Sequence, residues 1–308
     1  MAIYDIFNTS SLLLLEQVKF FVITINKYDD IPANLLYFSK ILSTKISEIM
    51  LKTTKILLPL AILFILIGCT NSEKKGNNSE PALNKLTKAE KEQGWILLFD
   101  GKTFNGWRGL GRDAVPEAHW VIENDAIHKV ESGEVPVQAD GQPLEGGDLM
   151  TIEAFRDFEL KFEWKISPGG NSGIKYNVSE ELSTRGGPSH AALGFEYQLL
   201  DDVNHPDNQN ITHLTASLYD MIPAINAPVK PVGEFNTSRI VFNGNHGEHW
   251  VNGVKVVDYD LGTARFDTLF QHSKYVRNPD FPEKRAGHIV LQDHSDEIWF
   301  RNIKIRKF

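Results

Sequence analysis

Five polar side chains have the types and spacing needed for acid–base chemistry on a polar ligand: Lys175, Glu196, Gln198, Gln292 and His294. Each lies in a segment whose opposite face carries large apolar residues, because strand side chains alternate between the two faces of a sheet. We therefore expect all five to point away from the core. A carboxylate, an imidazole and an ammonium group can transfer protons or stabilise charge, and two amides can bind hydroxyl groups. If their strands are neighbours in one sheet, the five side chains form a carbohydrate site.

The central segment of this prediction runs from Gly287 to Phe300, and its pattern is that of one strand with aliphatic residues on the core face. Asp293 falls on that core face. It is either a buried, hydrogen-bonded turn residue or a residue that orients His294. Lys175 and Glu196 also have a plainer interpretation, as a solvent-exposed ion pair that contributes little to stability.

Three more residues are predicted to bind substrate: Asn171, Tyr219 and His249. Asn171 shares a strand face with Lys175, and Tyr219 lies in a Ser-Leu-Tyr-Asp run that could border a pocket. His249 precedes a Trp-Val-Asn-Gly turn and has an alternative interpretation as an exposed hairpin residue.

The sequence leaves open whether the protein binds a divalent cation. His205 and His213 lie with three aspartates in the polar loop 201–215, where the two histidines and two carboxylates could hold a cation, but their spacing matches no metal-binding motif. The loop could hold a cation or be a plain surface loop.

Strand and turn signals dominate the chain after residue 94. Segment 158–166 alternates apolar and charged residues over nine positions, and an Asn-Asp turn joins two short strand patterns within 119–130. The only helical signals are a turn near 263–270 and a capping box from Thr87 to Glu90, which predicts a short helix over 88–93. Many short strands indicate one all-β sandwich or barrel over residues 87–308.

The first 86 residues have a different character. Residues 50–69 combine a basic start, an apolar run too short for a spanning helix and a Leu-Ile-Gly-Cys ending that resembles a bacterial lipobox. We expect Cys69, the only cysteine, to be lipidated; the alternative is a buried structural cysteine. Residues 1–49 are then a start-site extension before Met50, and residues 70–86 a flexible tether.

Composition narrows the class of partner. The net charge of −8 and the isoelectric point near 5.7 argue against nucleic acid. A single cysteine excludes an intramolecular disulfide. The sequence contains no nucleotide-binding glycine loop, nucleophile elbow or zinc-protease motif.

Several motifs in order along the chain resemble the 3-keto-disaccharide hydrolase domain family: Trp95 to Trp107, Asn171 to Tyr176, Glu196 to Asp201, Ser217 to Asp220, His249 to Gly253 and Gly287 to His294. The resemblance covers residues 94–308. It implies a concanavalin-like jelly-roll β-sandwich of two antiparallel sheets with a concave ligand face. It also implies an exported, often lipid-anchored protein, periplasmic or on the cell surface. Thr70 after the lipobox cysteine favours export past the inner membrane.

The related glucanases carry three carboxylates in a Glu-x-Asp-x-x-Glu strand motif, whereas this chain has Glu196-Tyr-Gln198-Leu-Leu-Asp201. An amide cannot ionise, and Asp201 falls on the opposite strand face, so we do not expect ordinary glucan hydrolysis. The resemblance implies cleavage of 3-keto-glycosides by proton abstraction at C2, elimination and addition of water. His294 and Glu196 would be base and acid in either order.

Lys175 would stabilise the enolate in that reaction, and a divalent cation is the alternative. The amides and His249 would hold sugar hydroxyls. The substrate would come from a sugar 3-oxidoreductase. The alternative function is a non-catalytic glycan-binding lipoprotein, because the same fold and a polar concave face also serve binding proteins.

Overall fold

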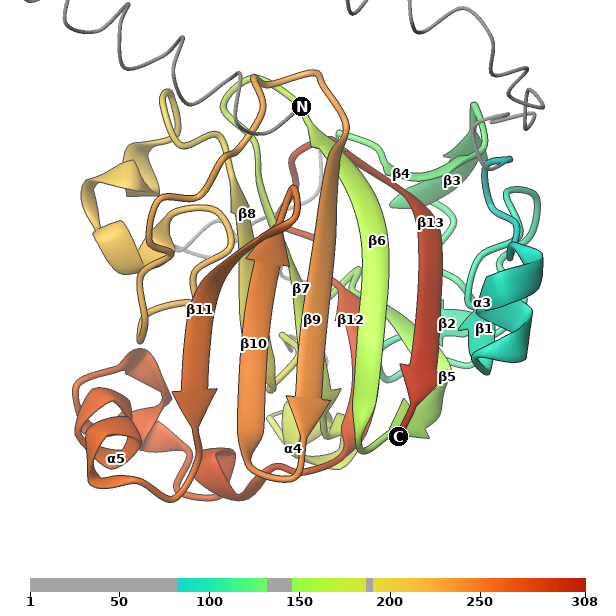
Figure 1. The fold of residues 1–308 in the computed structure, drawn as a ribbon. Helices are drawn as coiled ribbons and strands as arrows, with labels where there is room; N and C mark the ends of the chain where they lie inside the picture. Colours follow the sequence, from blue (N-terminus) through green and yellow to red (C-terminus); the bar gives the residue numbers. More distant parts are fainter. Residues whose placement is uncertain (1–81, 132–145, 187–190) are drawn as a thin grey trace, which may run out of the picture. The chain divides into compact units, whose positions relative to one another are not determined.

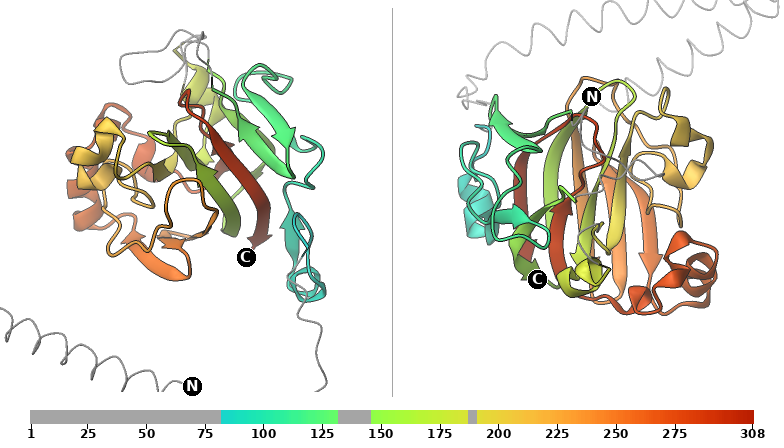
Figure 2. Two further views of the ribbon diagram at one scale, coloured as in Figure 1. Left: turned by 90° about the horizontal axis from the view of Figure 1, so that it is seen from above. Right: turned by 180° about the vertical axis from the view of Figure 1, so that it is seen from behind.

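Two antiparallel sheets lie face to face in the computed structural model of the protein, which describes residues 82–131, 146–186 and 191–308 (Figure 1). Figure 1 shows the larger sheet in front, and the right-hand view of Figure 2 shows the smaller sheet from behind. The predicted all-β jelly-roll sandwich is therefore confirmed. The predictions for the signal segment, Cys69 and the tether up to residue 81 lie outside the described residues.

The larger sheet contains eight strands in the described part of the chain. Its order is β11 (Val254–Asp260), β10 (His246–Val251), β9 (Asn236–Asn243), β6 (Phe158–Ile166), β13 (Ile298–Lys307), β4 (Ala126–Lys129) and β3 (Trp120–Glu123). β1 (Trp95–Leu97) pairs with the far end of β13, beyond a register shift between Arg301 and Lys304. That shift lets β13 pair with β4 and β1 one after the other.

The smaller sheet carries the predicted site. Its strand order is β2 (Trp107–Gly109), β5 (Leu149–Phe155), β12 (Gly287–Leu291), β7 (Asn171–Val178) and β8 (Phe195–Leu200). Short helices occupy the connections: α3 (Lys88–Glu92), α4 (Glu180–Thr184), α5 (Ala264–Gln271), η2 (Pro206–Gln209), η3 (Ile211–His213), η4 (Lys274–Arg277) and η5 (Phe281–Glu283). None of the helices in the described ranges is long and apolar enough to cross a bilayer.

Both helix predictions are confirmed by α3 and α5. Thr87 caps α3, and the reciprocal bond from Glu90 to the Thr87 backbone completes the capping box. α5 extends the predicted turn to eight residues, with Thr263 as its N-cap. Its buried residues, Phe266 and Phe270, join the core between the sheets, so packing stabilises a helix that is otherwise polar.

The core lies between the sheets and takes the apolar face of each strand. In β6 the buried apolar residues are those that the alternation predicts: Phe158, Leu160, Phe162, Trp164 and Ile166. In β8, Phe195, Tyr197 and Leu199 belong to the same cluster. Burial of each such side chain contributes about 1.5–3 kcal/mol. Glu196 and Gln198 consequently lie on the other face of β8.

The segment 287–300 is not one strand, and this part of the prediction is wrong. β12 ends at Leu291, and β13 begins at Ile298 in the opposite sheet. Gln292 still donates its backbone N–H to the carbonyl of Gly173 at 2.9 Å. The chain then leaves the sheet through Ser295, whose φ of 75° is left-handed and which no strand pattern reveals.

His249, expected to bind substrate or to be exposed, is neither exposed nor among the described residues that line the pocket over the smaller sheet. Its side chain is fully buried between the sheets, where Nδ1–H donates to the carbonyl of Ala216 at 2.9 Å and Nε2 accepts from the hydroxyl of Tyr176 at 2.9 Å. Tyr176 is bonded in turn to the hydroxyl of Tyr259 at 2.8 Å. Burial lowers the pKa of His249 to about 4, so the imidazole is neutral and structural.

Replacing His249 by Gln should remove part of the pH dependence of stability. The unfolded imidazole takes up a proton near pH 6.5 but the folded one only near pH 4, so stability present above pH 6.5 is lost as the pH falls toward 4. Urea unfolding across this interval should show a loss larger by roughly 3 kcal/mol in the wild type than in His249→Gln. The exposed-site control His272→Gln should match the wild type. Equal pH profiles for all three proteins would contradict a buried, neutral His249.

Candidate active site

The three strands that carry the predicted polar residues are neighbours, in the order β12, β7, β8. Lys175 on β7 lies opposite Glu196 on β8, and Gly173 lies opposite Gln198. On the other edge of β7, Lys175 lies opposite Val290. Alternation of side chains alone could not predict the order of the strands in the sheet. The observed order brings these residues together.

A pocket of about 390 Å³ opens over these strand ends. Six of the predicted residues line it: Asn171, Glu196, Gln198, Tyr219, Gln292 and His294. His205, Pro206 and Asp207 from the loop after β8 line another side, together with Lys274. Sequence reasoning assigned no role to Asp207 or Lys274, because loop residues have no periodicity that would reveal which way they point.

Lys175 has a different place from the one expected. It is 4% exposed and is not among the described residues that line the pocket. Its Nζ lies 3.7 Å from Oε2 of Glu196, and the same oxygen accepts a hydrogen bond from the Tyr275 hydroxyl at 3.3 Å. The pair is buried, not a surface ion pair. Lys175 thus offsets the cost of burying the Glu196 carboxylate charge.

Gly173 leaves room for the functional groups on the pocket floor. A Cβ at this position would lie 2.9 Å from Oε1 of Glu196 and 3.2 Å from Oε1 of Gln292. Both oxygens therefore occupy the space beside β7 that a side chain would fill. A glycine is needed at this position because the Glu196 and Gln292 side chains approach the backbone closely, and not because of the backbone conformation.

Two amide oxygens in the pocket are buried and lack a hydrogen-bond donor among the described residues: Oε1 of Gln198 and Oε1 of Gln292. Gln198 uses its Nε2 to donate to Oδ1 of Asn171 at 2.9 Å, which orients the amide. An unpaired buried acceptor costs about 1–3 kcal/mol. A ligand with hydroxyl donors would recover that energy, which is the chemistry of a sugar.

Tyr219 forms one wall and is held on both faces of its ring. The ring of His213 stacks on it at 4.2 Å, and the Nζ of Lys274 lies 4.1 Å from its centroid. His213 bridges Asp207 at 2.8 Å and Asp220 at 3.2 Å. Burial alone would lower the pKa of His213, but its bonds to these two carboxylates raise it. The wall is therefore an ordered ion-pair network.

Asp293 anchors the loop after β12 from a fully buried position. Its carboxylate accepts from Nδ1 of His119 at 2.5 Å and lies 3.1 Å from Nζ of Lys129. Its backbone N–H donates to Asp148, and its Oδ1 accepts from the backbone of Ser295. Burial alone would raise the pKa of Asp293, yet the His119 bond and the Lys129 charge hold it below its ordinary value. The loop that follows the pocket floor is thus fixed by an ionised group.

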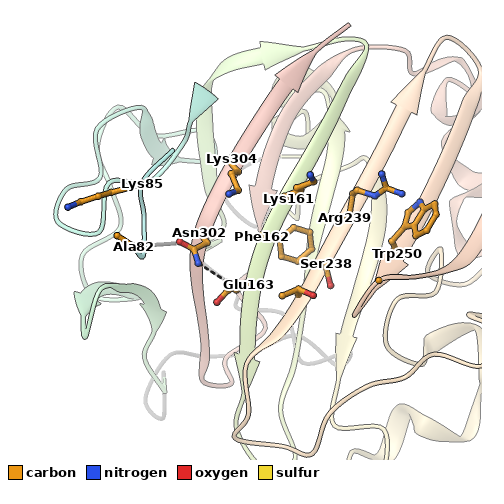
Figure 3. A pocket seen from close by; sticks show the side chains of 12 residues that line it. Ala82, Lys85, Lys161, Phe162, Glu163, Ser238, Arg239, Trp250, Asn302 and Lys304 are labelled. Atoms are coloured by element: carbon orange, nitrogen blue, oxygen red, sulfur yellow. Dashed lines mark hydrogen bonds between the residues drawn. The ribbon is translucent and has the colours of Figure 1, made fainter. Parts of the chain in front are cut away.

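A second hollow, of about 440 Å³, lies on the outer face of the larger sheet (Figure 3). It is lined by charged residues of β6, β9 and β13 and by Trp250 of β10. It shares no lining residue with the pocket on the smaller sheet. Sequence reasoning did not identify it.

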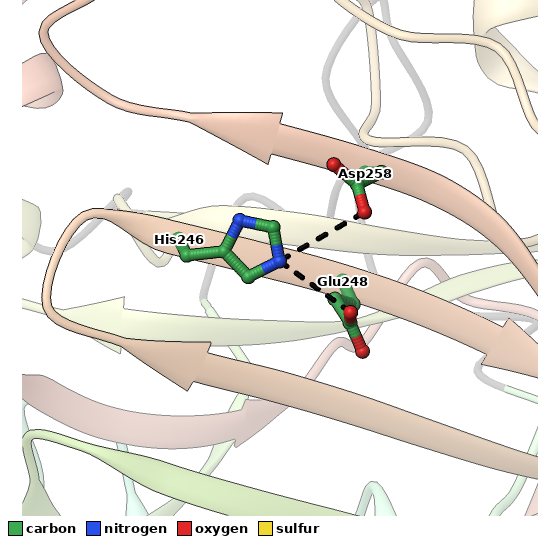
Figure 4. Close-up of side chains that lie close together, drawn as sticks. All are labelled: His246, Glu248 and Asp258. Carbon is green, nitrogen blue, oxygen red and sulfur yellow. Dashed lines mark hydrogen bonds and ion pairs between the residues drawn. The ribbon is translucent and has the colours of Figure 1, made fainter.

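The described residues include one cluster with metal-ligand geometry, formed by His246, Glu248 and Asp258 on the β10–β11 hairpin (Figure 4). Lys255 already lies 3.1 Å from Glu248 and 2.5 Å from Asp258. The ammonium group offsets part of the charge of the two carboxylates, so these side chains form an ion-pair network. It lies outside the pocket and does not explain a catalytic cation.

The fold and the site define the class of protein: an all-β jelly-roll sandwich with a polar pocket on its smaller sheet. Residues 94–306 match the family described as a 3-keto-alpha-glucoside-1,2-lyase-like domain, and the chain belongs to this family. The family expected from the sequence motifs is thus confirmed. A 3-keto-disaccharide hydrolase from Bacteroides thetaiotaomicron is 36% identical over 291 residues, covering 82% of this chain and 98% of the relative.

Solved structures agree with this assignment. A protein from Parabacteroides distasonis, provisionally described as a glycosyl hydrolase, superimposes with a TM-score of 0.64 at 30% identity and covers 74% of this chain and 100% of its own. A second protein from that organism with the same provisional description has a TM-score of 0.51 at 25% identity, with coverages of 70% and 99%.

Replacing Asp293 by Asn should destabilise the protein by about 3–5 kcal/mol, because the isosteric amide removes the buried negative charge that lies beside Lys129 and His119. Urea denaturation at neutral pH measures the change. The exposed Asp113→Asn should stay within about 0.5 kcal/mol of the wild type. A loss for Asp293→Asn no larger than that of the control would show that the buried pair does not anchor the loop.

Proposed function

We propose that the protein cleaves 3-keto-disaccharides in the pocket on the smaller sheet, by elimination followed by addition of water. The relative named a 3-keto-disaccharide hydrolase and the lyase-like description of the family support this reaction class. The observation that carries the proposal is Glu196, a carboxylate 2% exposed on the pocket floor and paired with Lys175.

A ketone at C3 of a sugar acidifies the hydrogen at C2. A base removes that proton, and the electron pair forms an enolate. The enolate then expels the glycosidic oxygen from C1, and an acid protonates that oxygen. Water adds across the C1–C2 double bond, with hydroxyl to C1 and hydrogen to C2, so the net reaction is hydrolysis. The chain must therefore supply a base, an acid and donors to the enolate oxygen.

Glu196 is the base in this proposal and His294 the acid. Lys175 holds the Glu196 carboxylate in place on the pocket floor, with its Nζ 3.7 Å from Oε2. His294 is only half-buried, near the mouth of the pocket, where a departing sugar would leave. Lys274 and the amide of Gln292 line the same pocket and are the donors that we assign to the enolate oxygen. Lys175 then acts through Glu196 and not on the enolate.

Ordinary retaining glycosidases need two carboxyl groups about 5–5.5 Å apart. Asp201, the candidate second carboxylate, is fully buried and accepts hydrogen bonds from the backbone of its own turn and of Gly169. Asp207 reaches the pocket, but its two oxygens are bonded to His213 and Tyr219. Both carboxylates therefore serve the structure, which favours a route that needs one ionised base.

The alternative of a non-catalytic glycan-binding protein is weaker on the same geometry. Sugar-binding modules present an open aromatic face on which a pyranose ring stacks. The ring of Tyr219 carries His213 and Lys274, so it does not offer such a face. A buried carboxylate beside an ammonium group is, in contrast, the equipment of an acid–base catalyst.

We further propose that the protein is exported and held to a bacterial membrane by a lipid on Cys69, as the Leu-Ile-Gly-Cys motif indicates. Its substrate is an oxidised disaccharide, so an oxidoreductase that forms a ketone at C3 must act before it. Mass spectrometry of the protein extracted from membranes should find a diacylglycerol-modified Cys69 at the N-terminus. An unmodified chain that begins upstream of Cys69 would contradict the anchor.

Incubation with a 3-keto-glucoside and with its unoxidised parent in deuterated buffer tests the reaction. NMR should show cleavage of the keto form alone, with one deuterium at C2 of the released 3-keto sugar. A parallel reaction with a chelator tests the divalent cation, and unchanged turnover is expected if Lys274 and Gln292 suffice. Cleavage of the parent, or a product without deuterium at C2, would refute the elimination route.

Replacing Gly173 by Ala should lower kcat/KM for the keto substrate by at least tenfold while the fold is kept. The added methyl group displaces Oε1 of Glu196 and Oε1 of Gln292, and misplaced catalytic groups lose rate steeply. Gly186→Ala, at an exposed position with no atom near the new Cβ, should be neutral. Kinetics and thermal unfolding together measure both effects. Wild-type kinetics in Gly173→Ala would place the reaction elsewhere.

A further inference from the structure

A row of cations crosses the outer face of the larger sheet. Lys304 on β13 lies opposite Lys161 on β6, Lys161 lies opposite Arg239 on β9, and Arg239 lies opposite Trp250 on β10. Figure 3 shows these four side chains one after another across the strands. Like charges directly opposite each other destabilise a sheet. Carboxylates beside the row offset part of this repulsion, with Glu90 paired to Lys304 and Glu159 to both Lys161 and Arg239.

The heads of these cations are held in place by neighbouring groups. The Nζ of Lys161 lies 4.4 Å from the centroid of Trp95, and the guanidinium of Arg239 lies 3.8 Å from that of Trp250. Glu159, only 5% exposed, lies 3.6 Å from Lys161 and 3.2 Å from Arg239. The aromatic faces and the buried carboxylate order the side chains without covering them, since Lys161 remains 40% exposed and Arg239 30% exposed.

The groove along this row is basic in an acidic protein. Four cations line it, Lys85, Lys161, Arg239 and Lys304, against the one carboxylate of Glu163. The whole chain has a net charge of −8. A hollow of about 440 Å³ can admit a chain-like ligand, whereas a flat lipid surface could not enter it.

We propose that this groove binds an anionic polysaccharide that bears carboxylate or sulfate groups. Adjacent strands are about 4.8 Å apart, so the three cations repeat at a spacing similar to the length of one sugar unit. Two successive acidic groups can thus meet Lys161 and Arg239, the more exposed cations, with the Glu90-bound Lys304 beside them. The indole of Trp250 contacts a pyranose ring at the end of the row. This site is separate from the catalytic pocket and would hold the enzyme on a charged glycan.

Calorimetric titration of the protein with oligogalacturonate, dextran sulfate and neutral dextran tests the proposal. We expect binding of the two anionic glycans, weakened by sodium chloride, and none of dextran. The double variant Lys161→Gln/Arg239→Gln should bind at least tenfold more weakly. Glu159 keeps its partner Arg306 at 2.5 Å in that variant, so the fold should persist. Trp250→Phe should weaken binding without any change of charge.

The matched control is Lys102→Gln/Arg265→Gln, which removes the same charge at two exposed positions. It should bind like the wild type. Turnover of a 3-keto-disaccharide should be unchanged in all of these variants. Equal weakening in the control and the groove variant would reveal non-specific attraction and overturn the proposal, as would no binding of either anionic glycan. Binding to phosphatidylglycerol vesicles that the groove variant loses, without any glycan binding, would assign the face to lipid instead.

Discussion

The site depends on one buried ion pair, Lys175 on β7 with Glu196 on β8. Neither charge could be buried alone, because the desolvation of an unpaired ion costs several kcal/mol. The two side chains face each other only in the observed register. A shift of β8 by one residue would turn Glu196 to the core side of the sandwich, away from Lys175. The strand register and the position of the Glu196 carboxylate therefore depend on the same contact.

The rest of the pocket follows from that pair. Gly173, two residues before Lys175, leaves the space in which the Glu196 and Gln292 oxygens approach. The charge of Lys175 also reaches Asp148, where burial raises the pKa and Lys175 opposes the rise. Asp148 accepts the backbone N–H of Asp293 and so supports the loop after β12. A single ammonium group therefore links the floor of the pocket to the loop beside it.

Alternation of side chains was sufficient to predict which residues leave the core, as Glu196, Gln198 and Gln292 show. Alternation could not predict how deeply each side chain is buried. Lys175 has the right parity but is buried beside Glu196 and does not line the pocket. His249 lies in the core, where hydroxyl groups accommodate it. Loop residues such as Asp207 and Lys274 were missed because their positions follow from tertiary ion pairs and have no period.

The central claim is that Glu196 removes the proton from C2. Exchange of the C2 hydrogen of an intact 3-keto-glucoside with deuterated water, followed by NMR, tests it most directly in Glu196→Gln and His294→Gln. The account predicts that His294→Gln still exchanges this hydrogen although it cleaves slowly, because the base remains and the acid is lost. Glu196→Gln should neither exchange nor cleave. Exchange at the wild-type rate in Glu196→Gln would show that another residue is the base.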